Sequence, residues 1–257
     1  GWLSIIAPHA GLSFPGLPWD GALEEAGGRQ DATPTHFLRA MPSLATRRGA
    51  LTPTALAKYS LCPRRYYLDH LCGLATWQYA SPREALDFAD GNAKEFGTEV
   101  HAILAGAAEE GASPEAAALA ARFWDSELGR RAARAERSER EYDFVVALQD
   151  LVVDGQIDLW FLEGGEAVIV DYKTDHVAGE AIAERARQYA IQLAVYRAVV
   201  KRLVPALPVR TYLHFLRPNV AIEVTSDLDP ELLKRVATDA EFATVGGTHC
   251  LRCPHLN

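Results

Sequence analysis

Apolar runs of strand length alternate with stretches of helical periodicity along most of the chain beyond residue 50. The clearest strands are residues 156–162 and 167–172, two apolar runs joined by Glu163-Gly164-Gly165-Glu166. Two consecutive glycines between such runs are typical of a β-hairpin, because the turn positions favour a positive φ. Further strands are predicted at residues 141–148, 209–216 and 220–224.

Helical periodicity predicts an opening helix from Thr52 and later helices over residues 96–110, 113–140, 183–204 and 230–244. The helix at residue 113 has a clear start, since Ser113-Pro114-Glu115 supplies an N-cap, a proline at the first helical position and an acidic second position. Strands interleaved with helices predict an α/β fold, a mixed central sheet of four to five strands flanked by helices.

The first part of the chain has a different character. Proline and glycine interrupt every longer apolar pattern in residues 1–50. We therefore expect an irregular N-terminal extension, either a linker or the remnant of a preceding domain, and a main domain at residues 51–257. The chain begins with Gly1 rather than methionine, which we interpret as a fragment of a longer polypeptide.

The composition is that of an ordinary soluble globular protein, with 49% hydrophobic and 23% charged residues. No apolar run reaches transmembrane length and the N-terminus has no signal-peptide pattern, so we expect a cytoplasmic location and no membrane partner. The formal net charge of −8 argues against a protein that coats nucleic acid. It does not exclude a nuclease, because bound metal masks an acidic site.

Charged residues inside the predicted hairpin are the first candidates for chemistry. Asp158 lies in the first apolar run, and Asp171 and Lys173 close the second. Carboxylates are poor strand formers and are seldom placed among apolar residues without a partner. On neighbouring strands the two carboxyl groups can converge on a hard divalent cation such as Mg²⁺ or Mn²⁺, with Lys173 near the attacking water. A buried Asp–Lys pair at a strand end is the alternative, and the hairpin alone does not decide between them.

A series of short motifs extends this hairpin in both directions. In chain order they are Leu51-Thr52-Pro53-Thr54 followed by Tyr59, Cys62-Pro63 and Tyr66-Tyr67; Phe96-Gly97-Thr98-Glu99-Val100-His101; Glu141 before Phe144; Gly155-Gln156-Ile157-Asp158; Val170-Asp171-Tyr172-Lys173-Thr174-Asp175; and Gln192 with Tyr196. Each motif alone is weak. Their ordered set over residues 50–257 resembles the PD-(D/E)XK nucleases, and more narrowly the RecB-type nuclease domains of the AddAB and RecBCD helicase–nucleases.

The resemblance implies a restriction-endonuclease-like nuclease core and a role for each motif residue. His101, Asp158, Asp171 and the backbone carbonyl of Tyr172 would hold Mg²⁺ or Mn²⁺, and Lys173 would position or activate the attacking water. Gln192 and Tyr196, four residues apart on one helix face, would lie beside Lys173, and Glu141 would add a metal or water contact at the edge of the site. Without the resemblance, a structural histidine at 101, a solvated Glu141 and an ordinary helix-surface pair at 192 and 196 are the competing interpretations.

The implied function is metal-dependent cleavage of DNA phosphodiester bonds. We expect a deoxyribonuclease of exonuclease type that prefers single strands or duplex ends, as the C-terminal module of a helicase–nuclease in end processing and recombinational repair. The partners would be DNA and a helicase motor. The alternative from another class is a catalytically silent DNA-end-binding or scaffolding module; silent members usually lose an Asp or the Lys, and Asp158, Asp171 and Lys173 are all present. A carboxylate-pair glycosidase is a third interpretation, in which Lys173 has no task.

The chain has four cysteines, Cys62, Cys72, Cys250 and Cys253. Nothing in the sequence indicates secretion, so we expect no disulfides. In a branch of the RecB-type family, one cysteine before the core and three after it hold a [4Fe–4S] cluster. Cys62, Cys250 and Cys253 match three of these positions, but the fourth is missing before the chain ends at Asn257, and Cys72 is a poor substitute. The resemblance therefore does not favour an intact cluster, although it predicts that Cys62 lies close to Cys250 and Cys253.

Overall fold

The structure is a computed structural model that describes residues 51–74, 91–107, 111–253 and 255. The predicted extension at residues 1–50 lies outside these residues, so the division of the chain at residue 50 stays a prediction. No helix within the described ranges is long and apolar enough to cross a membrane.

A mixed sheet of five strands forms the centre of the described region, in the order β1-β2-β3-β4-β5. The strands are β1 (Arg137–Leu148), β2 (Leu151–Glu163), β3 (Glu166–Lys173), β4 (Val209–Phe215) and β5 (Val220–Glu223). Strands β3 and β4 pair in parallel, and the other neighbours pair antiparallel. The predicted fold class, a mixed sheet flanked by helices, is confirmed.

The predicted hairpin is the β2–β3 pair. Its turn places Gly164 and Gly165 at φ values of +55° and +82°, the left-handed region that glycine occupies without steric cost. The turn fixes the register so that Leu159 faces Val170 and Leu162 faces Ala167. Both strands are longer than the predicted ranges of 156–162 and 167–172. The largest difference is at the start of β2, which extends back to Leu151 through its pairing with β1.

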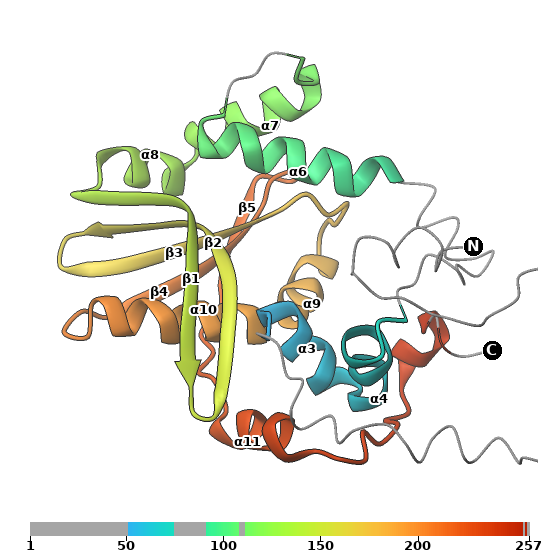
Figure 1. Cartoon of the computed structure of the whole chain (residues 1–257). Coiled ribbons are helices and arrows are strands. Elements are labelled where there is room, and N and C mark those ends of the chain that lie inside the picture. Colours follow the sequence, from blue (N-terminus) through green and yellow to red (C-terminus); the bar gives the residue numbers. More distant parts are fainter. Residues whose placement is uncertain (1–50, 75–90, 108–110, 254, 256–257) are drawn as a thin grey trace, which may run out of the picture. The chain divides into compact units, whose positions relative to one another are not determined.

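Helices cover both faces of the sheet and enclose two apolar cores (Figure 1). The first core lies under the opening helices and the helices after β3 and β5: α3 (Pro53–Leu61), α4 (Pro63–Tyr66), η2 (Tyr67–Leu71), α9 (Ala181–Gln188), α10 (Ala190–Leu203) and α11 (Pro230–Thr238). The second core lies under α6 (Gly91–Ala105), α7 (Pro114–Trp124) and α8 (Glu127–Arg134). Trp160 and Ile169 anchor the first core, whereas Phe123, Phe161 and Tyr172 anchor the second.

The single helix predicted over residues 113–140 is wrong. The structure has α7, a sharp turn, and then α8, with the strand β1 beginning at Arg137 rather than at residue 141. Ser126 follows the first helix and caps the second, since its hydroxyl accepts a hydrogen bond of 3.2 Å from the Gly129 N–H. Gly129 lies directly against the end of α7, where a Cβ atom would be 2.7 Å from the Trp124 Cα. The corner is therefore a tertiary packing feature that Ala-rich periodicity conceals.

Two other predicted helices are divided. The opening helix breaks at Cys62, where Pro63 starts the new helix α4, because proline favours the first turn of a helix. The helix predicted over residues 183–204 breaks at Tyr189, which ends α9 and precedes α10 with φ −95° and ψ −1°. The helix predicted over residues 230–244 ends early, at Thr238.

Replacing Gly129 by alanine should destabilise the fold by about 1–3 kcal/mol, because the added methyl group overpacks the α7–α8 corner against backbone that cannot yield. Urea denaturation measures the free energy of unfolding of each variant. Gly246→Ala is the matched control, since a Cβ there meets nothing within 4 Å. Equal stability of the two alanine variants would contradict the close packing at Gly129.

Candidate active site

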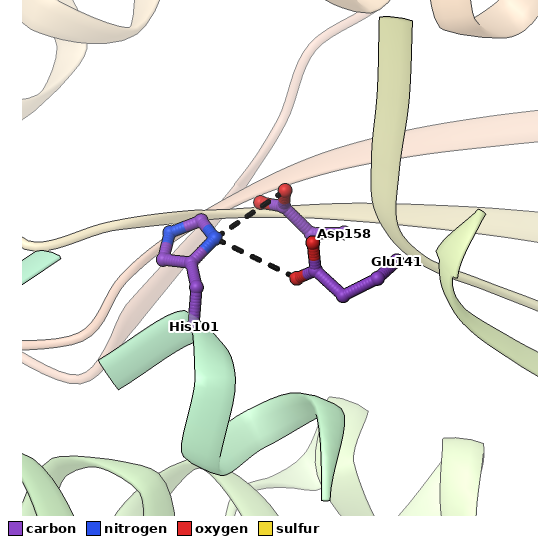
Figure 2. A group of neighbouring side chains, drawn as sticks. All are labelled: His101, Glu141 and Asp158. Carbon is purple, nitrogen blue, oxygen red and sulfur yellow. Dashed lines mark ion pairs between the residues drawn. The ribbon is translucent and has the colours of Figure 1, made fainter. Parts of the chain in front are cut away.

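Three side chains from three elements converge where α6 crosses the sheet: His101 from α6, Glu141 from β1 and Asp158 from β2 (Figure 2). The Nδ1 atom of His101 lies 3.5 Å from Asp158 Oδ1 and 3.8 Å from Glu141 Oε1. One atom of each side chain lies within 4.8 Å of the others, which makes this the one group of at least three potential metal ligands among the described residues.

An irregularity shared by β1 and β2 places the two carboxylates of this group opposite each other. The register passes from Arg140 opposite Leu159 to Tyr142 opposite Ile157, so Glu141 and Asp158 are the positions between. Glu141 has a φ of +46°, a left-handed conformation that costs a non-glycine residue free energy and is concentrated at functional sites.

The side-chain alternation of β2 changes at the same point. Before Asp158, Val153 and Ile157 face the first core, whereas after it Trp160 faces the first core and Phe161 the second. Odd and even positions therefore exchange faces at Asp158. In a regular strand the odd positions would all face one core and the even positions the other. Because the two sets exchange faces at Asp158, this side chain belongs to neither core.

Contacts on two sides of α6 hold His101 over the sheet. Gly97 faces Thr174, where a Cβ atom would lie 3.4 Å from the Thr174 hydroxyl, so a small residue lets the helix approach the end of β3 closely. The Thr174 carbonyl in turn accepts a hydrogen bond of 2.9 Å from Arg217 Nε. At the other side of the helix, the Glu99 carboxylate accepts a hydrogen bond of 2.9 Å from the Ser113 hydroxyl.

A second polar cluster lies at the end of β3, beside the first. The Nζ atom of Lys173 is 2.6 Å from Asp171 Oδ2 and 3.5 Å from Gln192 Oε1. The amide of Gln192 donates to Asp171 Oδ1 at 3.1 Å and to the Tyr196 hydroxyl at 2.8 Å. Asp171 is 1% exposed, so these contacts replace the water that its carboxylate has lost.

One backbone hydrogen bond connects the two groups. The Tyr172 N–H donates to Asp158 Oδ2 at 2.7 Å, so the carboxylate of Asp158 is oriented by β3 although it belongs to β2. Its other oxygen, Oδ1, remains directed toward His101. Asp158 thereby connects the group of His101, Glu141 and Asp158 to β3, the strand that carries the Asp171–Lys173 pair.

Burial and the neighbouring charges shift the pKa values of four residues in the site. Burial, followed by the charge of Asp158, raises the pKa of Glu141 to about 7. Burial alone would lower the pKa of His101, but its contact with Asp158 and the charges of Asp158, Asp171 and Glu141 raise that pKa overall. Burial raises the pKa of Asp171, although Lys173 opposes the shift. Burial alone would lower the pKa of Lys173, but the charges of Asp171 and Asp158 and the hydrogen bond to Asp171 together raise it, so its ammonium stays protonated.

These properties fit a divalent cation. Glu141 Oε1 is buried and has no hydrogen-bond partner, as expected of an atom whose partner is an ion. An imidazole nitrogen with carboxylate oxygens is a donor set for Mn²⁺ or Mg²⁺, and the nitrogen favours Mn²⁺. Asp171 uses one lone pair of each oxygen for Lys173 and Gln192, which leaves further lone pairs for a ligand.

A cleft of about 500 Å³ opens beside His101 and Glu141. Its walls come from α6, the β1–β2 pair and the end of β3, and it is lined by Gly97, Thr98, His101, Ala102, Glu141, Gln156 and Thr174. Of the three converging side chains, His101 and Glu141 line the cleft directly. The Asp171–Lys173 pair lies deeper, with 1% and 15% of its side chains exposed.

The structure brings most of the predicted site residues together. His101 and Asp158 are neighbours, and Asp171, Lys173, Gln192 and Tyr196 form one connected cluster. Asp171 lies outside the compact group of His101, Glu141 and Asp158.

For Glu141 the sequence leaves two interpretations open, a metal or water contact and a solvated residue at the start of a strand, whereas the structure places its carboxylate beside His101. Charged residues recur at the odd positions Arg137, Glu139, Glu141 and Asp143, with one interruption at Arg140, and this pattern indicates a strand that begins before residue 141.

The four cysteines are free thiols. Contacts that join the C-terminal segment to the opening helices agree with the expected packing: His255 Nε2 lies 2.6 Å from Asp69 Oδ1, and the Phe242 ring centroid lies 5.0 Å from that of Tyr67. Cys62 is buried between α3 and α4. Its proximity to Cys250 and Cys253 stays a prediction, as does the expectation that an intact iron–sulfur cluster is not favoured there.

Comparison with known proteins finds a family model, relatives and solved structures that are similar to this chain. The sequence model of the PD-(D/E)XK nuclease superfamily matches residues 50–257. A relative from Clostridium acetobutylicum, named as an ATP-dependent helicase/nuclease subunit, is 28% identical over 120 residues, which cover 40% of this chain and 10% of the relative. The protein of the same name from Anoxybacillus flavithermus is 34% identical over 98 residues, 36% of this chain and 8% of the relative.

The matched part of the chain therefore spans about a tenth of the length of these relatives. Among solved structures, a crystal structure of a protein from Eubacterium rectale aligns with a TM-score of 0.46 at 18% identity, covering 82% of this chain and 84% of that one.

Proposed function

The chain belongs to the PD-(D/E)XK nuclease superfamily, and from this premise we propose that it is an active, metal-dependent deoxyribonuclease. The observation that supports activity most strongly is the convergence of His101, Glu141 and Asp158 within 4.8 Å, next to the buried Asp171–Lys173 pair. A silent binding module has no need to keep a buried lysine and several carboxylates in unfavourable proximity.

His101, Asp158 and Asp171 would hold the cation, together with the Tyr172 carbonyl and Glu141. When bound, Mn²⁺ or Mg²⁺ supplies Lewis acidity for the phosphodiester and lowers the pKa of water. Because Glu141 has a pKa of about 7 and His101 a raised pKa, both can carry protons in the metal-free protein. Loading the site requires those protons to leave.

Lys173 would act on the reacting phosphate and its attacking water. Its ammonium is fixed between Asp171 and Gln192, and a fixed positive charge stabilises the negative charge that develops in the transition state. Gln192 would hold both members of the pair in place, since its amide reaches Asp171 and its carbonyl reaches Lys173. Tyr196 would orient that amide through its hydroxyl.

We further propose that the chain is the nuclease module of a longer helicase–nuclease. The names of the relatives support this, since they are ATP-dependent helicase/nuclease proteins and the match covers a small part of each. A helicase motor would then supply single strands or duplex ends, and the activity would be exonucleolytic in DNA end processing. The open cleft beside His101 is compatible with a flexible single strand.

The test is cleavage of end-labelled DNA by the purified protein. Single-stranded, blunt duplex and closed circular substrates should be incubated with Mn²⁺, with Mg²⁺, and with excess EDTA. We expect cleavage with either ion, a higher rate in Mn²⁺ because of the His101 nitrogen, and none in EDTA. Loss of linear but not circular DNA would indicate an exonuclease. Tight DNA binding without cleavage in any metal would support the silent scaffolding module instead.

A further inference from the structure

The side chain of Lys173 has a third neighbour besides Asp171 and Gln192. Its Nζ atom lies 4.4 Å from the centroid of the Tyr189 ring, within the range of a cation–π contact. Lysine has a flexible stem with several rotatable bonds, so one ion pair does not fix the direction of its ammonium. The Tyr189 ring therefore adds a third contact to the two polar partners of the ammonium.

Tyr189 is held by a pair of residues that the reaction itself does not use. Its hydroxyl donates to Asp175 Oδ2 at 3.1 Å. The Asp175 carboxylate also binds Arg185, with Nε at 2.7 Å and Nη2 at 2.5 Å from Oδ1. The Arg185 guanidinium lies 5.2 Å from the Tyr189 ring centroid, so the same two residues fix both the hydroxyl and the ring.

The chain breaks a helix to place this tyrosine. The sequence from Ala181 to Leu203 has no proline or glycine, and its periodicity predicts one continuous helix. The structure nevertheless ends α9 at Gln188 and starts α10 at Ala190. Local departures from sequence preference are expected at functional positions, where tertiary contacts compensate for them. Here the compensating contacts are those of Tyr189 with Asp175, Arg185 and Lys173.

We propose that Asp175, Arg185 and Tyr189 are positioning residues for Lys173, with the Tyr189 ring restraining the ammonium and the Asp175–Arg185 pair restraining the ring. This rests on the proposed nuclease function of Lys173. The arrangement reaches the proposed site through the contact of Tyr189 with Lys173, and none of its three residues is a proposed ligand of the cation. Its loss should therefore lower the rate of the chemical step without weakening the binding of DNA or metal.

The experiment compares Tyr189→Leu, Tyr189→Phe and wild type in Mn²⁺-dependent cleavage of single-stranded DNA. Tyr189→Leu should lower kcat by about 10- to 100-fold, the effect of a misplaced catalytic group, while KM and the Kd for Mn²⁺ stay unchanged. Tyr189→Phe keeps the ring and should keep most of the activity. A role in packing alone predicts that the two variants lose activity in step with their thermal stability, and that result would overturn the proposal.

Arginine variants supply a matched control on one helix. Arg185→Gln removes the support of the ring and should reduce kcat in the same direction as Tyr189→Leu. Arg187 lies two residues after Arg185 on α9 and forms a surface ion pair with Glu184. Arg187→Gln removes this ion pair and should leave kcat at the wild-type value. Equal rates for the two glutamine variants would contradict a role for Arg185.

A second measurement does not depend on cleavage. Acetic anhydride modifies exposed amines, and mass spectrometry gives the rate at which Lys173 is acetylated in the metal-free protein. We expect slow acetylation in wild type and Tyr189→Phe and severalfold faster acetylation in Tyr189→Leu. If the wild-type protein does not cut DNA, the proposed function fails, yet this comparison still decides whether Tyr189 restrains the lysine. An unchanged acetylation rate in Tyr189→Leu would overturn the positioning role.

Discussion

Replacing Lys173 by methionine should reduce DNA cleavage by about 100- to 1,000-fold, the usual effect of removing a preorganised group that stabilises charge in a transition state. Methionine keeps an unbranched apolar stem in the space between Asp171 and Tyr189 and removes only the ammonium. Single-turnover cleavage of labelled DNA in Mn²⁺ measures the rate. DNA affinity should change little, since 15% of the lysine side chain is exposed and one surface charge at most is lost.

The fold should survive this change. Asp171 keeps its hydrogen bond from Gln192, and because burial already raises its pKa, the carboxyl can take up a proton when its ion-pair partner is lost. Lys201→Met is the control, because Lys201 lies on the outer side of α10, where its pairing with Asp227 is exposed. A Lys173→Met protein that degrades DNA at the wild-type rate would show that the assigned site is wrong.

Sequence alone predicts those parts of the fold whose cause is local. The β2–β3 hairpin follows from Gly164 and Gly165, whose positive φ values are ones that glycine adopts readily. The proximity of Asp158 to Asp171 and Lys173 then follows, because the hairpin register pairs Leu159 with Val170, the neighbours of Asp158 and Asp171. Spacing of four residues likewise predicts that Gln192 reaches Tyr196, as the hydrogen bond of 2.8 Å between them confirms.

Features with a tertiary cause were not predictable in the same way. Glu141 enters the site because its backbone adopts a left-handed conformation opposite Asp158, and no local preference of glutamate predicts it. The helix breaks at Ser126 and Tyr189 depend on Gly129 lying against the end of α7 and on Asp175 binding the tyrosine. The sequence pattern predicts one continuous helix in each of these two segments. Packing at Gly129 and the polar partner of Tyr189 outweigh that preference.

Asp158→Asn should weaken Mn²⁺ binding by about 10- to 100-fold or more, since even partners that only orient a metal ligand contribute that much. The substitution is nearly isosteric, and its amide oxygen can still accept the hydrogen bond that Tyr172 N–H donates to Asp158 Oδ2. What disappears is the negative charge facing His101 and Glu141. Isothermal titration calorimetry gives the Kd, and cleavage should fall with it at fixed Mn²⁺.

The metal-free protein offers an independent readout of the same change. Asp158 is the chief group that raises the pKa of His101, so in Asp158→Asn the imidazole should lose its proton at a lower pH than in wild type, as followed by NMR of the ring. Asp143→Asn is the matched control: it removes one negative charge from the same strand as Glu141, at an exposed residue that binds Gln156. If both variants bind Mn²⁺ like wild type, Asp158 is not a ligand, and the cation site must be sought around Asp171 instead.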